Sequence, residues 1–387
     1  MRSESISSIS FCRAGLTTIF FLFFILASSL MDVHAAQKGN QQIKSLIFGE
    51  ELSIGVREGD DHYMFGNSIM VNADDAGNIY VTDWDKKLIR KYDRNGKYLL
   101  TIGRPGQGPG EFSNISVARF DKAGNIYVLD FAARKIVFFD PNGKYLNQKV
   151  FLSGFVDLRI TPAGTYLGIQ SRWSEISGIK QLAEIRGIFD SRFELLTELR
   201  ATSAPIPRPP KMDPKGRAEE ISQYIFQPEA LYALDDDGII YFGYSAKYSI
   251  GVYSAEGKKL RTISRDGDPP KSDKQDRDDF FEYEWDDYSR YIPPATKDQM
   301  KKFIQFPYFK PYFERLVPLE NGWLAVVVDS ERNRTVLLDL FDQEGRFLDR
   351  VKAAVPMTNL FFKNGKAYAV KSDMGYLFVK RYSFDIR

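Results

Sequence analysis

The hydrophobic and polar positions of the chain follow a pattern that occurs twice at a fixed spacing. A turn at Gly77-Asn78 precedes the apolar run Ile79-Tyr80-Val81, and the same order recurs 47 residues later in Gly124-Asn125 and Ile126-Tyr127-Val128. Gly and Asn favour turns because they tolerate positive φ, and β-branched and aromatic residues favour strands. Three consecutive apolar residues are typical of a strand covered on both faces. The pattern predicts short, buried strands in an internal repeat.

Each copy of the repeat continues into a second turn, at residues 93–96 (DRNG) or 140–143 (DPNG), so that one repeat reads as four antiparallel strands. Weaker copies begin near residues 164, 237, 321 and 364. Repeats of this length with short strands indicate a β-propeller. When two insertions are set aside, about 45 residues remain for each of six blades. We therefore expect an all-β fold, a six-bladed β-propeller of four-stranded antiparallel blades.

The sixth copy ends at Arg387 before an outer strand has formed. Ile54-Gly55 followed by Phe65 resembles Ile102-Gly103 followed by Phe112, where one blade passes to the next. We therefore expect residues 43–55 to supply the missing strand and to close the last blade. Closure of the ring in this way removes a free sheet edge. The prediction is one propeller domain over residues 37–387.

The linker between the first two copies carries a family resemblance. Residues 101–112 (TIGRPGQGPGEF), followed by residues 124–130 (GNIYVLD), resemble the NHL-repeat family. The whole chain looks like the bacterial six-bladed β-propeller proteins related to that family, and the likeness is sharpest over residues 65–150. The resemblance implies a propeller but no single activity, because this fold hosts many functions.

The N-terminal segment has the plan of a secretory signal peptide. Arg2 and Arg13 precede an apolar run, residues 16–30, and Val33-His34-Ala35 offers small or aliphatic residues at the positions that a signal peptidase reads. The run is shorter than the roughly 20 residues of a membrane span. We predict a signal peptide over residues 1–36 and a secreted or periplasmic protein with no membrane span after cleavage. An uncleaved anchor is the alternative.

Composition excludes several classes of function. Lys and Arg number 53 and Asp and Glu 51, a formal net charge of +2, which argues against a nucleic-acid partner. One Cys and two His exclude a disulfide framework and a Cys/His zinc cluster. Cleavage would remove Cys12 and His34. His62 would remain in an inter-blade linker, which disfavours a Ser-His-Asp triad and the His-dependent streptogramin lyases.

Two segments fall outside the repeat, residues 201–228 and 266–312. The first is rich in Pro and basic, and the second places aromatic residues among many acids and ends in a short predicted helix at 297–306. Both join an outer strand to the next inner strand, so we expect them on one face, as a lid over the channel. Long loops on a rigid scaffold often carry function, although a cover for apolar surface is the alternative. The expected contact residues are Phe280, Tyr283, Trp285, Tyr288 and Arg208.

A channel metal ion is the second hypothesis. Glu229 resembles the inner-strand glutamate of the gluconolactonase-like propellers, which place calcium in the channel, and Asn67 and Asn114 occupy equivalent positions in the first two blades. Calcium takes oxygen ligands, so the resemblance implies a site formed by these three residues. In the alternative, the asparagines cap turns and Glu229 pairs with an arginine. Asp83 and Asp130 recur with the repeat, so we expect both to accept backbone hydrogen bonds.

These observations favour a non-enzymatic, exported scaffold that binds a peptide, glycan or protein partner on the lidded face. The alternative is a calcium-assisted hydrolase of the lactonase or esterase type, or a lyase, in the central channel. No cofactor other than calcium is expected.

Overall fold

The computed structural model describes residues 44–121, 123–151, 154–176, 179–205, 213–285, 297–320, 322–331, 335–353 and 358–386. Residues 44–387 form one compact unit. The predicted signal peptide lies outside the described residues.

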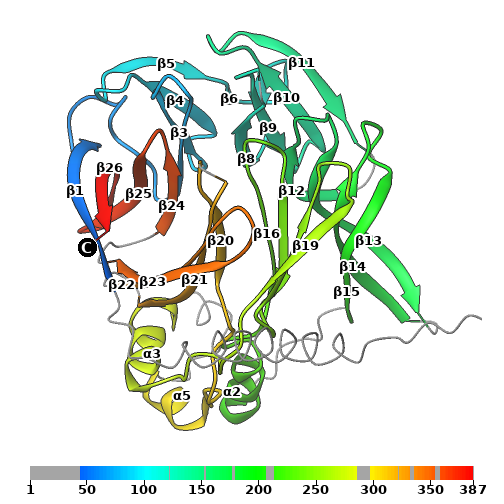
Figure 1. The fold of residues 1–387 in the computed structure, drawn as a ribbon. Coiled ribbons are helices and arrows are strands. Elements are labelled where there is room, and N and C mark those ends of the chain that lie inside the picture. The colour runs from blue at the N-terminus through cyan, green and yellow to red at the C-terminus, as the bar shows by residue number, and fades with distance from the viewer. Residues whose placement is uncertain are drawn as a thin grey trace, which may run out of the picture. The chain divides into compact units, whose positions relative to one another are not determined.

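Six four-stranded antiparallel blades make up this unit and confirm the predicted propeller (Figure 1). Blade 1 contains β2 (Ile69–Ala73), β3 (Ile79–Asp83), β4 (Leu88–Tyr92) and β5 (Tyr98–Ile102). Blade 2 contains β8 (Ile115–Phe120), β9 (Ile126–Asp130), β10 (Lys135–Phe139) and β11 (Tyr145–Val150). Blade 3 contains β12 (Gly154–Ile160), β13 (Tyr166–Ile176), β14 (Ile179–Phe189) and β15 (Leu195–Pro205).

The second half repeats the same order of strands. Blade 4 contains β16 (Ala230–Leu234), β17 (Ile240–Tyr244), β18 (Ser249–Tyr253) and β19 (Lys259–Ser264). Blade 5 contains β20 (Arg315–Pro318), β21 (Leu324–Glu331), β22 (Thr335–Phe341) and β23 (Phe347–Ala353). Blade 6 contains β24 (Thr358–Lys363), β25 (Lys366–Asp373), β26 (Tyr376–Ile386) and β1 (Lys44–Ile54). A small ribbon of β6 (Arg104–Pro105) and β7 (Glu111–Phe112) links blades 1 and 2.

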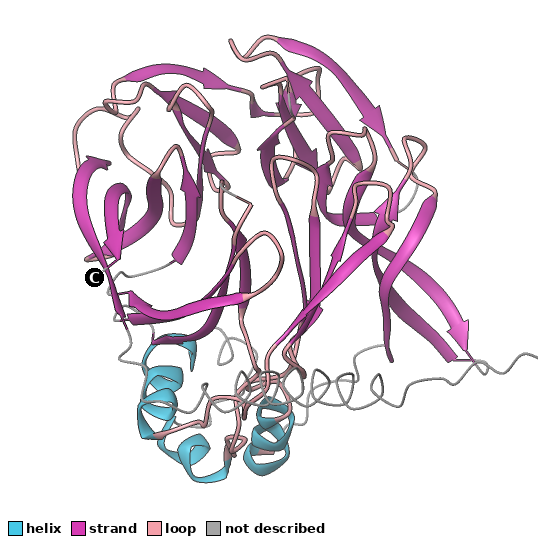
Figure 2. Cartoon of the chain, in the orientation of Figure 1, coloured by secondary structure: helices cyan, strands magenta, loops and turns pink. Residues whose placement is uncertain are grey.

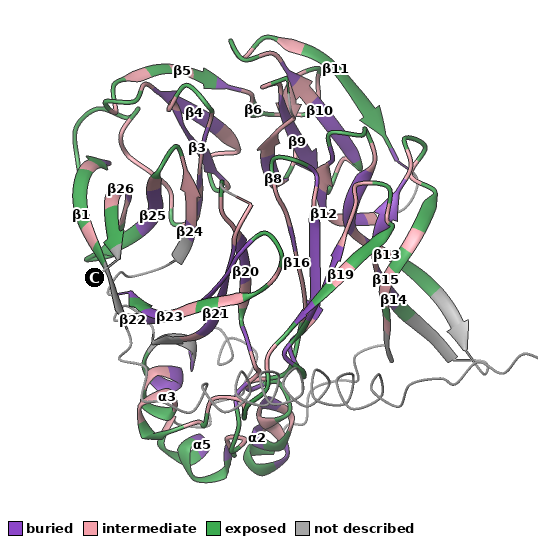
Figure 3. Ribbon diagram, viewed as in Figure 1, coloured by how far each residue is buried: buried purple, intermediate pink, exposed green. Residues whose placement is uncertain are grey.

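The first strand of each blade lies at the centre of the ring, where β8 contacts β12, β16 contacts β20, and β24 contacts both β2 and β20. The core lies in the seams between blades. The seam of blades 2 and 3, for example, buries Leu129 and Ile136 of one blade against Phe155 and Phe189 of the other. Figure 3 shows buried residues concentrated in the inner and middle strands, while the outer strand β11 is largely exposed.

The N-terminal strand closes the ring, as the sequence predicted. β1 pairs antiparallel with β26 over Leu46–Ile386 to Ile54–Val379, and the two strands lie side by side in Figure 1. The structure adds a feature that the sequence did not predict. The first residues of β1 also pair in parallel with β23 of blade 5, so that blades 5 and 6 share one eight-stranded sheet.

Both insertions emerge on the same face of the ring, called here the insertion face, because the outer strand of one blade ends there and the next inner strand begins there. Figure 2 shows the helices gathered on one side of the strands. They are α2 (Pro214–Ser222), α3 (Lys274–Asp279), the π-helical turn η2 (Phe280–Glu284) and α5 (Lys297–Phe303). The helix predicted over 297–306 is present but shorter, because α5 ends at Phe303. The first insertion starts later than predicted, because β15 continues to Pro205. No helix in the described ranges is long and apolar enough to cross a membrane.

Candidate functional site

The two insertions fold into one helical subdomain with a small core of its own. Ala218, Ile221 and Ile225 from the first insertion pack against apolar residues of the second, among them Met300 and Ile304. The backbone N–H of Gln305 also donates to the hydroxyl of Ser222, at 2.9 Å. Asp213 caps the N-terminus of α2 and accepts the N–H of Gly216, and Asp273 caps that of α3 with a reciprocal capping box. Segments far apart in the sequence thus form one rigid structure on the insertion face.

Lys310 fastens this subdomain to the propeller. Its ammonium group lies 3.0 Å from the carboxylate of Asp276 in α3 and 2.5 Å from that of Asp329 in β21. Burial alone would lower the pKa of Lys310, but the hydrogen bonds to Asp329 and Asp276 outweigh it, and the pKa is raised. The lysine therefore stays charged and links the second insertion to blade 5.

The predicted contact residues take two different positions. Phe280 and Trp285 are buried in the core of the helical subdomain, so a partner would meet neighbouring side chains instead of these two rings. This placement matches the alternative in which the aromatics cover apolar surface. Tyr288, Arg208 and the side chain of Tyr283 lie outside the described residues.

Other aromatic side chains of the insertions are exposed. Tyr308 and Phe309 are 62% and 41% exposed, and their rings lie 4.7 Å apart, edge to face. Main-chain hydrogen bonds hold their segment in place, because the N–H of Ser272 donates to the carbonyl of Tyr308 and the N–H of Lys310 donates to that of Pro270. This pair is not among the predicted contact residues, which come mainly from the acidic, aromatic stretch before it. The adjacency of two large aromatics beside a proline, at 307–309, is the signal that was present.

The three residues of the calcium hypothesis occupy corresponding places at the starts of the inner strands β2, β8 and β16. The backbone N–H of Asn67 donates to Asp85, that of Asn114 to Asp130, and that of Glu229 to the Ser245 hydroxyl. All three side chains are exposed. Among the described residues, no group of three or more His, Cys, Asp and Glu side chains is arranged to hold a metal ion. The calcium site formed by Asn67, Asn114 and Glu229 stays a proposal.

The repeated aspartates have the structural role that the sequence predicted. Asp130 is fully buried and accepts backbone N–H groups from Ser113 at 2.7 Å and from Asn114 and Ala133 at 3.1 Å. Asp83 accepts those of Gly66 and Lys86 in the same way. Each carboxylate therefore holds the segment that leads into the inner strand of its own blade.

His62 is a surface residue, as expected for a linker. Its Nδ1 lies 2.7 Å from a carboxylate oxygen of Asp60, and its ring stacks on Tyr98 with centroids 3.9 Å apart. Hydrogen bonds from the backbone and ring of His62 lower the pKa of Asp60. The histidine is about half exposed, which gives it the environment of a solvated loop residue.

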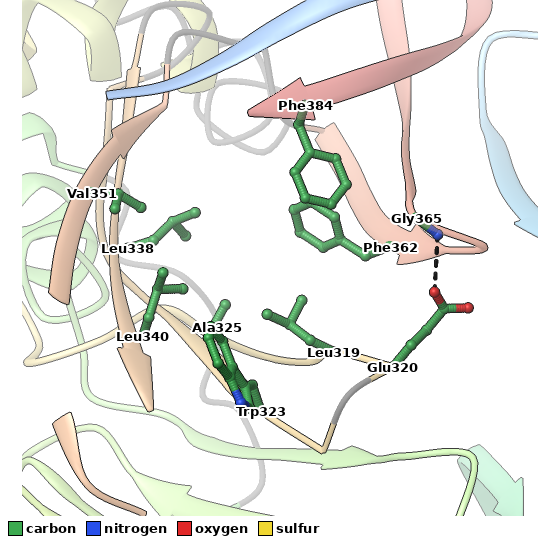
Figure 4. A pocket seen from close by; sticks show the side chains of 10 residues that line it. All are labelled: Leu319, Glu320, Trp323, Ala325, Leu338, Leu340, Val351, Phe362, Gly365 and Phe384. Carbon is green, nitrogen blue, oxygen red and sulfur yellow. Dashed lines mark hydrogen bonds between the residues drawn. The ribbon is translucent and has the colours of Figure 1, made fainter. Parts of the chain in front are cut away.

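An apolar cavity of about 240 Å³ lies between blades 5 and 6 (Figure 4). Leu338, Leu340 and Val351 form the wall of blade 5, and Phe362 and Phe384 form that of blade 6. At the rim, the carboxylate of Glu320 accepts backbone N–H groups of blade 6, and Figure 4 marks the bond from Gly365.

The cavity follows from the way the ring is closed. In the other seams, the turn between the third and fourth strands packs against the preceding blade. A Cβ atom on Gly345 would lie only 2.8 Å from Ile263 of blade 4, and one on Gly143 only 2.9 Å from Ile102 of blade 1. Val351 holds the corresponding position in blade 5. Blade 6 has no such turn among the described residues, because its fourth strand is β1, which pairs with β26 from the N-terminal side of the first blade. Val351 therefore faces a cavity.

Comparisons with known proteins agree with this architecture. Residues 58–167 match the family described as "6-bladed beta-propeller". A candidate exported protein from Bacteroides fragilis NCTC 9343 is 13% identical, with a TM-score of 0.52, and the alignment covers 91% of this chain and 97% of that chain. Virginiamycin B lyase from Staphylococcus aureus is 10% identical, with a TM-score of 0.42, and the alignment covers 88% of this chain and 99% of that chain.

No curated protein matches the sequence. At 13% identity, the likeness to the Bacteroides protein shows the fold alone. The six blades and the family match lead to one conclusion: the chain is a six-bladed β-propeller.

Proposed function

We propose that this protein is an exported, non-enzymatic binding module that engages a protein, peptide or glycan partner on the insertion face. The observation that carries the proposal is the exposed pair Tyr308 and Phe309 on the rigid helical subdomain. Aromatic rings that are already held in place give a large contact area at a small entropic cost, and they are enriched in binding interfaces.

The surroundings of the pair support the same function. The ammonium group of Lys271 lies 5.3 Å from the centre of the Tyr308 ring, and the exposed Phe303 and Tyr224 belong to the same helical subdomain. Exposed aromatic groups on a monomer commonly mark an interaction site. Export is supported by the apolar N-terminal run that follows Arg2 and Arg13.

An array of immobilised peptides and glycans tests the proposal. The mature chain is compared with the Tyr308→Ala/Phe309→Ala double variant and with Phe131→Ala, an exposed aromatic in a turn of blade 2. We expect the wild type and Phe131→Ala to bind the same array members, and the double variant to lose them. The proposal is overturned if the wild type binds no member or if the double variant binds as the wild type does.

A further inference from the structure

Two arginines and one aspartate meet on the inner strands of blades 2 and 3. Arg119 lies on β8, and Asp157 and Arg159 lie on β12. One guanidinium nitrogen of Arg119 is 4.0 Å from one Asp157 oxygen, and Nε of Arg159 is 3.9 Å from the other. These strands form the inner edges of their blades, so the group lies where blades 2 and 3 converge on the centre of the ring.

The hydrogen bonds of Asp157 go to other groups. The Tyr232 hydroxyl of blade 4 donates to one oxygen at 2.7 Å, and the backbone N–H of Leu158 donates to the other at 2.8 Å. The distances to the guanidinium groups are too long for hydrogen bonds. Within the described residues, Nε of Arg119 and Nε of Arg159 are both buried without a hydrogen-bond partner. Among the described residues, the aspartate therefore leaves the Nε donor of each arginine without an acceptor.

The charges in this group do not balance. Burial opposes the ionisation of Asp157, but the positive charges of Arg119 and Arg159 outweigh it and lower the pKa of the carboxyl group. Burial, followed by repulsion from Arg119, lowers the pKa of Arg159. The group thus carries two positive charges and one negative charge in a place where charge is costly to bury. A second negative group would relieve the repulsion between the arginines.

We propose that Arg119 and Arg159 bind a carboxylate group of a small ligand in the central channel. A guanidinium group presents parallel N–H donors that match the two oxygens of a carboxylate, and such charge-assisted pairs are among the stronger hydrogen bonds in proteins. The side chains of Arg119 and Arg159 are 25% and 23% exposed, so both keep some contact with solvent. The guanidinium group of Arg159 is held 5.3 Å from the centre of the Tyr232 ring, which limits its movement.

This site is separate from the aromatic pair of the proposed function. The inner strands begin at the insertion face, and both arginines stand one residue before the ends of their strands, near the opposite face. The inference goes beyond the proposed function, and either can fail while the other holds.

Titration calorimetry at low salt tests the site with matched pairs of probes. Glucuronate is compared with glucose, and the α-amide of N-acetylglutamate with that of N-acetylglutamine. We expect at least one acidic probe to bind, and its neutral counterpart to show no heat. The acidic probe that binds tells whether the carboxylate comes from a sugar or from a peptide. Binding of neither acidic probe at millimolar concentration overturns the proposal.

The variants separate binding from a structural role. Arg119→Gln and Arg159→Gln are expected to weaken the binding of the acidic probe about tenfold or more. Asp157→Asn keeps a hydrogen-bond acceptor for Tyr232 but removes the competing charge, so it should tighten binding roughly fivefold to tenfold. Arg261→Gln on β19 is the control, because its buried Nε also lacks a partner but lies on an outer strand.

The predicted tighter binding of the acidic probe to Asp157→Asn tests the proposal even if an arginine variant fails to fold. Unchanged or weaker binding in that variant, with its melting temperature maintained, overturns the proposal. Equal losses in Arg261→Gln and in the two channel variants also overturn it.

Discussion

The seam between blades 4 and 5 contains a fully buried carboxylate, and its removal should be costly. Asp339 on β22 is 0% exposed and accepts hydrogen bonds from the Tyr248 hydroxyl at 2.8 Å, from Arg265 at 2.5 Å, and from two nitrogens of Arg350 at 2.5 and 2.9 Å. Burial alone would lower the pKa of Arg350, but the hydrogen bond and the negative charge of Asp339 outweigh burial, and the pKa of Arg350 is raised.

The expected loss of unfolding free energy depends on how far Arg265 and Arg350, the partners of Asp339, are exposed. Asp339→Asn keeps the volume of the side chain but leaves two cations without their anion. Breaking a buried ion pair costs about 3–5 kcal/mol. The side chains of Arg265 and Arg350 are 28% and 30% exposed, so water screens them in part. We therefore expect a loss at the lower end, roughly 3 kcal/mol of unfolding free energy.

Urea unfolding followed by circular dichroism measures this loss, with Glu344→Gln as the matched control in the same blade. Glu344 pairs with Arg346 at 3.0 Å, but both side chains are exposed, so the control should lose less than about 1 kcal/mol. A loss in Asp339→Asn no larger than that of the control would refute the reasoning, because the seam would then not depend on the buried charge.

Four further predictions follow from the structure. Gly345→Ala should destabilise the fold by about 1–3 kcal/mol more than Gly365→Ala in thermal unfolding, because both glycines have positive φ but only Gly345 lies against the preceding blade; equal losses would contradict the turn-packing argument. Ala325→Val adds apolar volume to the cavity between blades 5 and 6 and should raise stability by about 0.5–1.5 kcal/mol; a lower melting temperature would show that the cavity cannot accept it. The calcium proposal predicts a calcium-induced rise in melting temperature that Glu229→Ala abolishes, and no rise in the wild type would remove it. Intact mass of the exported protein should place the first residue at Gln37, and a mass that includes residues 1–36 would indicate an uncleaved anchor.

The blades were predictable from the sequence because their signals are local. A glycine-containing turn, a buried run such as Ile79-Tyr80-Val81 and a second turn lie within one repeat, and each favours the same structure by itself. Closure by β1 was predictable because the last repeat lacked a strand. The parallel pairing of β1 with β23 was not, because nothing in either strand specifies a second neighbour.

The helical subdomain shows where local reasoning fails. Phe280 and Trp285 stand among acids, which is the pattern of an exposed contact, yet they pack against the other insertion. Their partners Ala218, Ile221 and Ile225 follow one another at intervals of three and four residues, the period of a helix with one apolar face. That period was the available signal. The channel group of Arg119 and its neighbours gave no signal of this kind, because its members come from different blades.

The arrangement as a whole separates two kinds of surface. Apolar side chains fill the seam between blades 2 and 3, while the inner edges of the same blades carry Arg119, Asp157 and Arg159. Substitutions of the apolar residues in a seam change only stability. A buried charge that is only partly satisfied lowers stability, and an apolar residue of similar volume could pack in its place. The proposed carboxylate ligand would supply the second negative charge that this group lacks.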